Sequence, residues 1–339
     1  MKYLITGGVG FIGTNTAITF ATSIKNSIVL VDDFSRPGVK LNAKYLTRKF
    51  ANIKIIKANV KDTNKYLSEL KKTDVIIHLA GQTAVTTSIT NPTLDFSSNI
   101  VGGFTLLETV RKYNPKAAVL YSSTNKVYGN LENHDLQLDK KNSQYKDMCH
   151  PMGIDENEQL NFISPYGCSK GTIDSYMLDY GRIYGLKTIV FRQSCIYGPF
   201  QIGVEDQGWV AFFAKQALAK KPLTIFGDGY QVRDLLYVGD LIDAYSKAIE
   251  KIEKIKGNAI NVGGGITNSF SLLQVIATLE KKTRHPIQLT FNTERPGDQK
   301  LFISANKKAK KILGWVPRTS FHKGLDILLD WQRQYLFNQ

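Results

Sequence analysis

Short apolar runs alternate with helix-like stretches along the first half of the chain. The runs that are long enough for a strand lie at residues 3–6, 27–31, 53–57, 74–79, 117–122 and 188–191. Helix-forming stretches fit between most of them, for example at 99–113 and 166–184. Because parallel strands need a crossover connection between them, this alternation predicts an α/β fold with a doubly wound parallel sheet.

The pattern changes after Gly198. Helices are expected at 207–220, 238–252, 304–313 and 323–335, and strands at 223–226 and 259–262. A Gly-rich turn at 227–229 follows the first of these strands. The second half therefore predicts a smaller mixed α/β lobe whose segments cross back to the first domain.

Composition narrows the functional class. The chain has 339 residues, of which 42% are hydrophobic, so a sizeable core is expected. The net charge of +15 comes largely from lysines scattered as at 251–256 and 307–311, a pattern typical of solvated helix faces. We therefore expect no nucleic acid partner. No apolar run is long enough for a membrane span, so no membrane insertion is expected.

Cysteine and histidine positions limit the chemistry further. The cysteines Cys149, Cys168 and Cys195 form no CxxC pair, which is typical of free thiols, and the chain start has no signal-peptide layout. A cytoplasmic location is the expectation. No spacing of His, Cys, Asp and Glu indicates a metal site, so no metal is expected. His78 ends the fourth predicted strand and is expected to be a core histidine rather than a catalyst.

A glycine pattern follows the first predicted strand. Gly7, Gly10 and Gly13 have the spacing GxxGxxG at the first strand-to-helix turn. Such a turn lets the backbone approach a pyrophosphate at a helix N-terminus. Asp32 ends the second predicted strand, where a carboxylate pairs with a ribose 2′-hydroxyl and disfavours a 2′-phosphate. The pattern predicts NAD binding; Arg36 keeps NADP open as an alternative, because a guanidinium there can hold the phosphate.

A tyrosine and a lysine are spaced for one helix face. Tyr166 and Lys170 stand at i and i+4, with Ser164 as the expected N-cap and Pro165 as the first helical residue. A nearby ammonium is expected to lower the pKa of the phenol, so that it takes a proton from an alcohol. The hydroxyls of the YSST run at 121–124 end the fifth predicted strand and are placed to share that proton.

These residues make the chain similar to the extended short-chain dehydrogenase/reductase family. The likeness covers essentially the whole chain, from the glycine pattern to LGWVP at 313–317. Within that family the chain is similar to the CDP-tyvelose (CDP-paratose) 2-epimerases. Three stretches carry this likeness, HLAGQTAVTTSITNP at 78–92, YSSTNKVYG at 121–129 and SPYGCSKG at 164–171, the last continuing to YMLDY at 176–180.

The resemblance implies a role for each matching position. It implies a catalytic triad of Thr124, Tyr166 and Lys170. The implied NAD contacts are Gly7, Gly10, Phe11, Ile12, Gly13, Asp32, Arg36, Asn59, Val60, Leu79, Ala80, Gly81, Gln82, Asn99, Ser122, Tyr166 and Lys170. The implied substrate contacts are Thr86, Ser123, Thr124, Asn125, Gln193, Cys195, Trp209, Thr224, Phe226, Arg233, Arg295 and Asp298. Arg233 and Arg295 would grip a diphosphate, since a guanidinium fork suits its oxygens.

The implied organisation has two parts. Residues 1–192, with about 232–262, would form a Rossmann-like NAD-binding domain. Residues 193–231 and 263–339 would form the nucleotide-sugar-binding lobe, and 130–162 would form a lid or wall over the sugar. By resemblance we expect a homodimer or homotetramer.

Four positions depart from the wider family. Asn59 stands where relatives usually carry Asp, and Cys195 stands where many carry Asn at a substrate-facing position. Sugar 4,6-dehydratases of the family resemble Thr-Asp-Glu where this chain has Thr124-Asn125-Lys126. An amide and an ammonium do not supply the acid and base that elimination of water needs, so dehydration is not expected.

The resemblance leaves a choice of reactions. The first hypothesis is a CDP-paratose/CDP-tyvelose 2-epimerase, in which the sugar is oxidised transiently to a 2-keto form with tightly bound NAD and serves O-antigen or related polysaccharide biosynthesis. The triad equally permits a UDP-hexose 4-epimerase. A third hypothesis, from another class, is a non-catalytic NAD-binding regulatory protein, which the intact triad disfavours.

Overall fold

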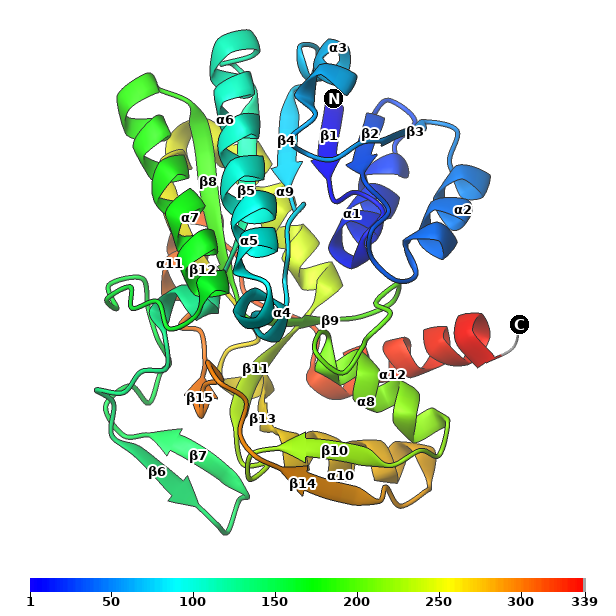
Figure 1. Ribbon diagram of the computed structural model, residues 1–339, viewed down its shortest axis with the longest axis vertical. Helices are drawn as coiled ribbons and strands as arrows, with labels where there is room; N and C mark the ends of the chain where they lie inside the picture. Colours follow the sequence, from blue (N-terminus) through cyan, green and yellow to red (C-terminus); the bar gives the residue numbers. More distant parts are fainter. Residues whose placement is uncertain (338–339) are drawn as a thin grey trace.

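The centre of the molecule is a parallel sheet of seven strands. The structure, a computed structural model, describes residues 1–337 (Figure 1). The sheet order is β12-β8-β5-β4-β1-β2-β3. The strands are β1 (Lys2–Thr6), β2 (Ser27–Asp32), β3 (Ile53–Lys57), β4 (Val75–His78), β5 (Ala118–Thr124), β8 (Lys187–Gln193) and β12 (Asn258–Val262). The order reverses between β1 and β4, and ligands of open α/β sheets bind at such a point, outside the carboxyl ends of the strands. The doubly wound sheet is as predicted.

Both faces of this sheet are buried under helices. Along β5, Ala118 and Leu120 join one core cluster, whereas Val119 and Tyr121 join the other, because successive side chains of a strand point to opposite faces. One face is covered by α1 (Phe11–Ala21), α2 (Val39–Lys49) and α9 (Val238–Ile255). The other is covered by α3 (Leu67–Leu70), α6 (Gly102–Tyr113) and α7 (Pro165–Tyr184). The predicted near-continuous apolar strands follow from this two-sided burial.

A smaller lobe lies below the carboxyl ends of the strands (Figure 1). Its sheet contains β9 (Cys195–Tyr197), β11 (Val232–Tyr237), β13 (Ser269–Ser271) and β15 (Leu301–Phe302), and β10 (Leu223–Phe226) pairs separately with β14 (Leu289–Asn292). Its helices are α8 (Trp209–Leu218), α10 (Leu272–Thr283) and α12 (Phe321–Gln332). Side chains from these helices and from β10 and β11 share one buried cluster. The lobe is therefore mixed α/β, as predicted.

Segments of the second half cross between the two lobes. Within the segment at about 232–262, α9 and β12 belong with the main sheet, whereas β11 pairs in the small sheet. Helix α11 (Lys307–Leu313) packs against α9 and β12, with Ala309 and Trp315 in the core beneath the main sheet. The apolar pattern of a segment does not indicate which other segment it packs against. The placements of β11 and α11 could therefore not be predicted from it.

The remaining elements border the carboxyl edge of the main sheet. Helices α4 (Val85–Thr90) and α5 (Pro92–Asp95) follow β4. A π-helix at Phe96–Val101 leads into α6, where one helix from 99 was expected. The hairpin of β6 (Leu136–Asp139) and β7 (Gln144–Asp147) extends from the segment at 130–162, for which no strand was predicted. Within the described residues, no helix has both the length and the apolar character needed to cross a membrane.

Candidate active site

The turn after β1 brings backbone very close to the end of β4. Gly7 has φ +66, and a Cβ there would lie 2.9 Å from the Ala80 amide nitrogen. A Cβ on Gly13 would lie 2.4 Å from the Gly7 carbonyl oxygen. Only glycine fits these positions, and Gly10 then caps the N-terminus of α1. The result is an anion-binding helix end at the switch point of the sheet.

Asp32 is fixed at the end of β2. One carboxylate oxygen accepts from the Val9 amide at 3.2 Å and the other accepts from the Phe34 amide at 2.9 Å. Burial raises the pKa of Asp32, and these two amide hydrogen bonds oppose that rise. The carboxylate therefore faces the groove in a set orientation.

A groove of about 590 Å³ runs along this edge of the main sheet. It is lined by every residue predicted to contact NAD except Asn99. Asn99 lies behind the wall, where its Nδ2 donates to Asp95 at 3.0 Å and to Ser169 at 2.9 Å. Its Oδ1 faces Gly81, since a Cβ on that glycine would lie 2.4 Å from it. Asn99 thus supports the wall of the groove and is not one of the residues that line it.

Helix α7 carries the tyrosine and lysine on its buried face. The Ser164 hydroxyl accepts from the Gly167 amide at 3.1 Å, and Pro165 starts the helix, as predicted. Tyr166 is only 9% exposed and Lys170 only 6%. One turn of helix separates them, so both side chains reach the carboxyl end of β5.

The Lys170 ammonium is directed at β5 rather than at the phenol. Its Nζ donates to the Ser122 carbonyl and lies 4.4 Å from the ring centre of Tyr121. Burial lowers the pKa of Lys170 to about 8, against the opposing charges of Asp95 and Asp174. The amine is therefore still largely protonated at neutral pH.

Tyr166 differs from the expectation of an acidic phenol. Burial raises its pKa to about 12, while a hydrogen bond with Thr124 and the charge of Arg36 lower it and Asp95 raises it. Arg36 is thus a cation whose charge lowers the pKa of the phenol, and its guanidinium also donates to the Thr83 hydroxyl at 2.9 Å. The Lys170 ammonium is held by the Ser122 carbonyl.

A second cavity of about 290 Å³ opens between the two lobes. The predicted substrate contacts that line it are Thr86, Thr124, Asn125, Cys195, Trp209, Thr224, Phe226, Arg233, Arg295 and Asp298. Ser123 and Gln193 do not line it. The Ser123 hydroxyl donates to Asp174 at 2.8 Å, and the Gln193 amide is buried against the Tyr245 hydroxyl at 2.5 Å. Alternation along β5 and β8 turns both side chains into the core.

Two cations share one carboxylate in this cavity. Asp298 lies 2.6 Å from Arg233 and 3.4 Å from Lys126. Burial would raise the pKa of Asp298, but the two cations outweigh it and lower the pKa to about 2. Burial lowers the pKa of Lys126 to about 8, opposed mainly by Asp298. The trio keeps a positive surplus, which suits a bound anion.

Arg295 lies over an aromatic ring at the same cavity. Its guanidinium carbon is 3.8 Å from the ring centre of Phe226. The same group lies 3.3 Å from both Glu205 and Asp206. Sequence reasoning missed Lys126, Glu205 and Asp206 as cavity residues, and only the packing of the lobes brings them there.

The cofactor groove and the second cavity meet at a common wall. Tyr166 lines both, as do Thr83 and residues 206–208. His78 lies behind this region, fully buried, and its ring nitrogen is 2.7 Å from the Thr6 hydroxyl. Burial lowers the pKa of His78 to about 3, so it is a neutral core histidine as expected. The phenol therefore stands where a cofactor and a second ligand would meet.

Comparison with known proteins agrees with this geometry. The profile of the GDP-mannose 4,6 dehydratase family matches residues 4–328. The chain belongs to this family. A CDP-paratose 2-epimerase of Salmonella typhi is 43% identical over 338 residues, covering 98% of this chain and 99% of that protein. A putative UDP-glucose 4-epimerase of Methanocaldococcus jannaschii is 30% identical over 97% of this chain and 98% of its own length.

A solved structure shows the same fold within the family. The UDP-glucuronic acid 4-epimerase from Bacillus cereus, in complex with UDP-glucuronic acid and NAD, superimposes with a TM-score of 0.85 at 28% identity. The match covers 98% of this chain and 99% of that one. Both lobes are therefore shared with an enzyme that holds a dinucleotide and a nucleotide sugar together.

The segment 130–162 takes no part in either cavity of this family member. None of its described residues lines the groove or the second cavity. The hairpin β6–β7 instead packs on the outer edge of the small lobe, where the Tyr145 hydroxyl donates to Asp228 at 2.6 Å. The predicted lid or wall over the sugar is therefore wrong, because cross-lobe contacts hold this segment away from the site.

Proposed function

We propose that this chain is an NAD-dependent nucleotide-sugar epimerase, specifically a CDP-paratose/CDP-tyvelose 2-epimerase. The observation that carries the proposal is Tyr166, whose side chain lines both the cofactor groove and the second cavity. The full-length relative of 43% identity points to the same reaction. The protein is thus proposed to bind a CDP-deoxyhexose beside NAD.

The groove residues fit NAD. The close approach at Gly7 and Gly13 leaves room for a pyrophosphate over the first turn of α1, and Asp32 offers a carboxylate for ribose hydroxyls. Arg36 is bonded to Thr83 near the phenol, which favours NAD over NADP. When bound, NAD accepts and returns the hydrogen of the sugar carbon, so that oxidation to a keto sugar is transient.

Side chains of the protein transfer the proton of the sugar hydroxyl. Tyr166 takes the proton of the sugar hydroxyl and later gives it back, while the Thr124 hydroxyl shares the hydrogen bond. The positive charge of Arg36 stabilises the phenolate form. Lys170 holds the Ser122 carbonyl at the groove and so fixes the backbone that would line a bound NAD there.

The second cavity suits a nucleoside diphosphate. Arg233 and Lys126 supply more positive charge than Asp298 cancels, and Arg295 adds a guanidinium fork. Trp209 and Phe226 provide aromatic surface for a base. Asn125 donates to Gln299 at 3.1 Å and Lys126 is held by Asp298, so neither is placed as the acid or base of a dehydratase.

The direct test is an NMR assay of the purified protein with CDP-paratose. We expect conversion to CDP-tyvelose with no added NAD, and no deuterium at carbon 2 in deuterium oxide, because the removed hydrogen is returned. Tyr166→Phe should abolish turnover and retain NAD, whereas Tyr176→Phe, an exposed tyrosine of the same helix, should leave turnover intact. Solvent deuterium at carbon 2, or an active Tyr166→Phe variant, would contradict the proposed mechanism.

A UDP-hexose 4-epimerase is the second candidate. The relative from Methanocaldococcus jannaschii and the Bacillus cereus structure favour it, since both names state a UDP-sugar 4-epimerase. Running UDP-glucose, UDP-glucuronic acid and CDP-paratose side by side separates the candidates by product. If none of the sugars is converted and Tyr166→Phe changes nothing measurable, a non-catalytic NAD-binding regulatory role remains.

A homodimer or homotetramer is also part of the proposal. Helices α6 and α7 expose Phe104, Tyr113, Tyr176, Ile183 and Tyr184, the last three at 40%, 61% and 50%. Such an apolar face suits pairing with a second copy. Light scattering should give at least twice the chain mass of 38.0 kDa, and Phe104→Glu should lower it. A monomer at micromolar concentration would contradict this.

The cellular role follows from the reaction. Cys149, Cys168 and Cys195 are all free thiols, in accord with a cytoplasmic enzyme. A 2-epimerised CDP-deoxyhexose is an activated sugar, and we assign it to O-antigen or related polysaccharide biosynthesis. Deletion of the coding sequence should remove the epimerised deoxysugar from the hydrolysed polysaccharide.

A further inference from the structure

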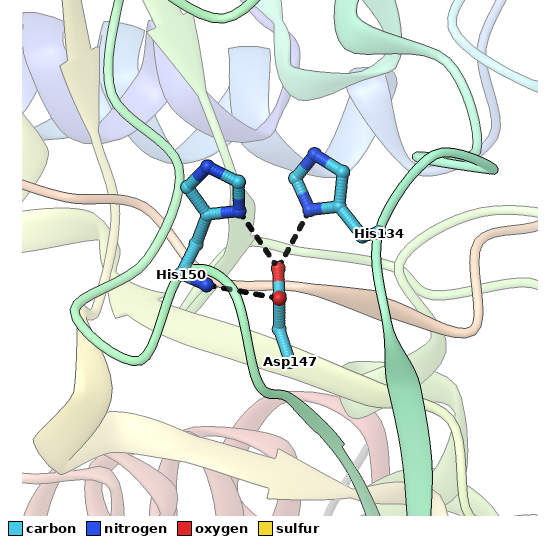
Figure 2. Close-up of side chains that lie close together, drawn as sticks. All are labelled: His134, Asp147 and His150. Atoms are coloured by element: carbon cyan, nitrogen blue, oxygen red, sulfur yellow. Dashed lines mark hydrogen bonds and ion pairs between the residues drawn. The ribbon is translucent and has the colours of Figure 1, made fainter.

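Two histidines and an aspartate converge at the base of the β6–β7 hairpin. His134 comes just before β6, Asp147 ends β7, and His150 lies in the loop that follows (Figure 2). Their ligand-capable atoms all lie within 4.8 Å of one another. The cluster lines neither the cofactor groove nor the second cavity. The catalytic chemistry therefore does not explain it.

The three groups point at one place. His134 Nδ1 is 2.6 Å from Asp147 Oδ2, and His150 Nδ1 is 3.5 Å from the same oxygen. The imidazole rings are nearly parallel, at 25° with centroids 4.3 Å apart. Ligand atoms on a tetrahedral zinc ion, with bonds of about 2.0–2.1 Å, stand roughly 3.3–3.4 Å apart. Small side-chain movements therefore bring these atoms to bonding distance of one ion.

The second nitrogen of His134 has a partner of the kind found behind metal ligands. Its Nε2 is 3.3 Å from Glu158 Oε2. A neutral imidazole carries one N–H, so it donates to one carboxylate and presents a lone pair to the other. With the proton on Nε2 facing Glu158, Nδ1 presents its lone pair toward Asp147 and can bind a metal ion held between the two side chains. This is the carboxylate–histidine–metal arrangement.

Asp147 is prepared to act as a ligand. Its Oδ1 accepts from the backbone amides of Cys149 at 2.9 Å and His150 at 3.0 Å, which leaves Oδ2 for the imidazoles. The side chains of His134 and Asp147 are 5% and 2% exposed, whereas that of His150 is 41% exposed and leaves an entry path.

We propose that His134, Asp147 and His150 form a binding site for a divalent transition-metal cation of the zinc class. Three protein ligands leave one coordination position for water. Imidazole and carboxylate ligands suit this class of ion better than Mg²⁺ or Ca²⁺, which take oxygen ligands alone. Sequence spacing alone indicated no such site, because the hairpin brings the three ligands together. The expectation of no metal is therefore replaced by this proposal.

In this proposal the ion stabilises the fold and takes no part in the epimerase reaction. An ion here ties the start of β6, the end of β7 and the loop after it, and so closes the base of the hairpin. The hairpin in turn contacts the small lobe, where the Tyr145 amide donates to the Tyr230 carbonyl at 3.2 Å. Metal loading should therefore raise thermal stability, and it should leave the epimerase chemistry at Tyr166 intact.

The test uses untagged full-length protein treated with a chelator and then titrated with Zn²⁺ by calorimetry. We expect one Zn²⁺ per chain and a higher Tm after loading. His150→Ala should weaken binding at least tenfold, and Glu158→Ala about 10–100-fold, as for loss of an outer-shell carboxylate. The matched control His322→Ala, an exposed histidine of the small lobe, should bind as the wild type does.

Other outcomes overturn the proposal. If the wild type binds no Zn²⁺, or if His150→Ala binds it with unchanged affinity, the cluster is a hydrogen-bonded His134–Asp147 pair with a stacked His150, and it is no metal site. An equal Tm in the presence of Zn²⁺ and of chelator would also contradict the metal site. Because His150 is partly exposed, its loss should leave the fold intact, and circular dichroism of the variant verifies this.

Discussion

Removal of Asp174 should cost this protein much of its stability. Asp174 lies on α7, one turn beyond Lys170, and its side chain is fully buried. Its carboxylate binds Arg192 of β8 through two hydrogen bonds, Nε at 2.9 Å and Nη2 at 3.1 Å. Ser123 donates to the same carboxylate. Asp174 thus joins β5, α7 and β8 within the buried part of the main domain.

The size of the stability loss follows from the burial of both Asp174 and Arg192. The Arg192 side chain is 7% exposed, so Asp174→Leu leaves a buried guanidinium without a counter-charge. Breaking a buried pair in this way costs about 3–5 kcal/mol. A domain has only about 5–15 kcal/mol of stability in total. The single change therefore removes a large share of it.

The double variant separates charge from packing. In Asp174→Leu/Arg192→Met the uncompensated charge is gone, and the main residual loss is the unsatisfied Ser123 hydroxyl, about 1–3 kcal/mol. We therefore expect the double variant to be more stable than Asp174→Leu alone. Urea unfolding followed by circular dichroism at low temperature gives the three free energies of unfolding.

A surface pair provides the control. Lys282 and Asp326 lie 2.6 Å apart with side chains 21% and 57% exposed, and removing that pair should cost no more than about 1 kcal/mol. The reasoning is refuted if Asp174→Leu costs as little as this control, or if the double variant is less stable than the single one.

Three further predictions concern the site. Arg36→Gln should move the acidic limb of the kcat/KM pH profile to higher pH. The Arg36 charge lowers the pKa of Tyr166, so its loss lets that pKa rise. An unchanged profile would contradict this. Asp32→Ala should weaken NAD binding by about 1.5–3 kcal/mol, roughly 10–150-fold in Kd by calorimetry, and reduce the preference over NADP. Arg233→Met should raise the Kd for CDP at least tenfold, since Asp298 then cancels the Lys126 charge; unchanged CDP binding would exclude Arg233 from the diphosphate site.

The first domain was largely predictable because its signals are local. Strand β3 has the predicted bounds, and the other predicted strands of the main sheet differ only at their ends. The glycine pattern, Asp32 and the Ser164-Pro165 helix start depend on neighbours within a few residues, and each has its predicted geometry. Short-range physics determines these features, so a single sequence suffices for them.

The features that escaped prediction depend on distant partners. The charge of Arg36 lowers the pKa of Tyr166, although the two residues are 130 positions apart in the sequence. The Lys170 ammonium donates a hydrogen bond to the Ser122 carbonyl of β5. Ser123 and Gln193 are polar residues beside the motifs, yet alternation of the strands turns them into the core. No property of these residues alone indicates such partners. They follow from the register of β5 and β8 against α7.

The wall shared by the groove and the second cavity has a thermodynamic consequence. Thr83, Tyr166 and residues 206–208 line both the groove and the second cavity. A ligand that orders this shared wall therefore reduces the entropy cost of ordering it for the other ligand. Linkage then requires reciprocity: whatever factor the dinucleotide adds to the affinity for the sugar nucleotide, the sugar nucleotide adds to the affinity for the dinucleotide. The enzyme would therefore hold its coenzyme most firmly while a substrate is present, without any contact between distant parts of the chain.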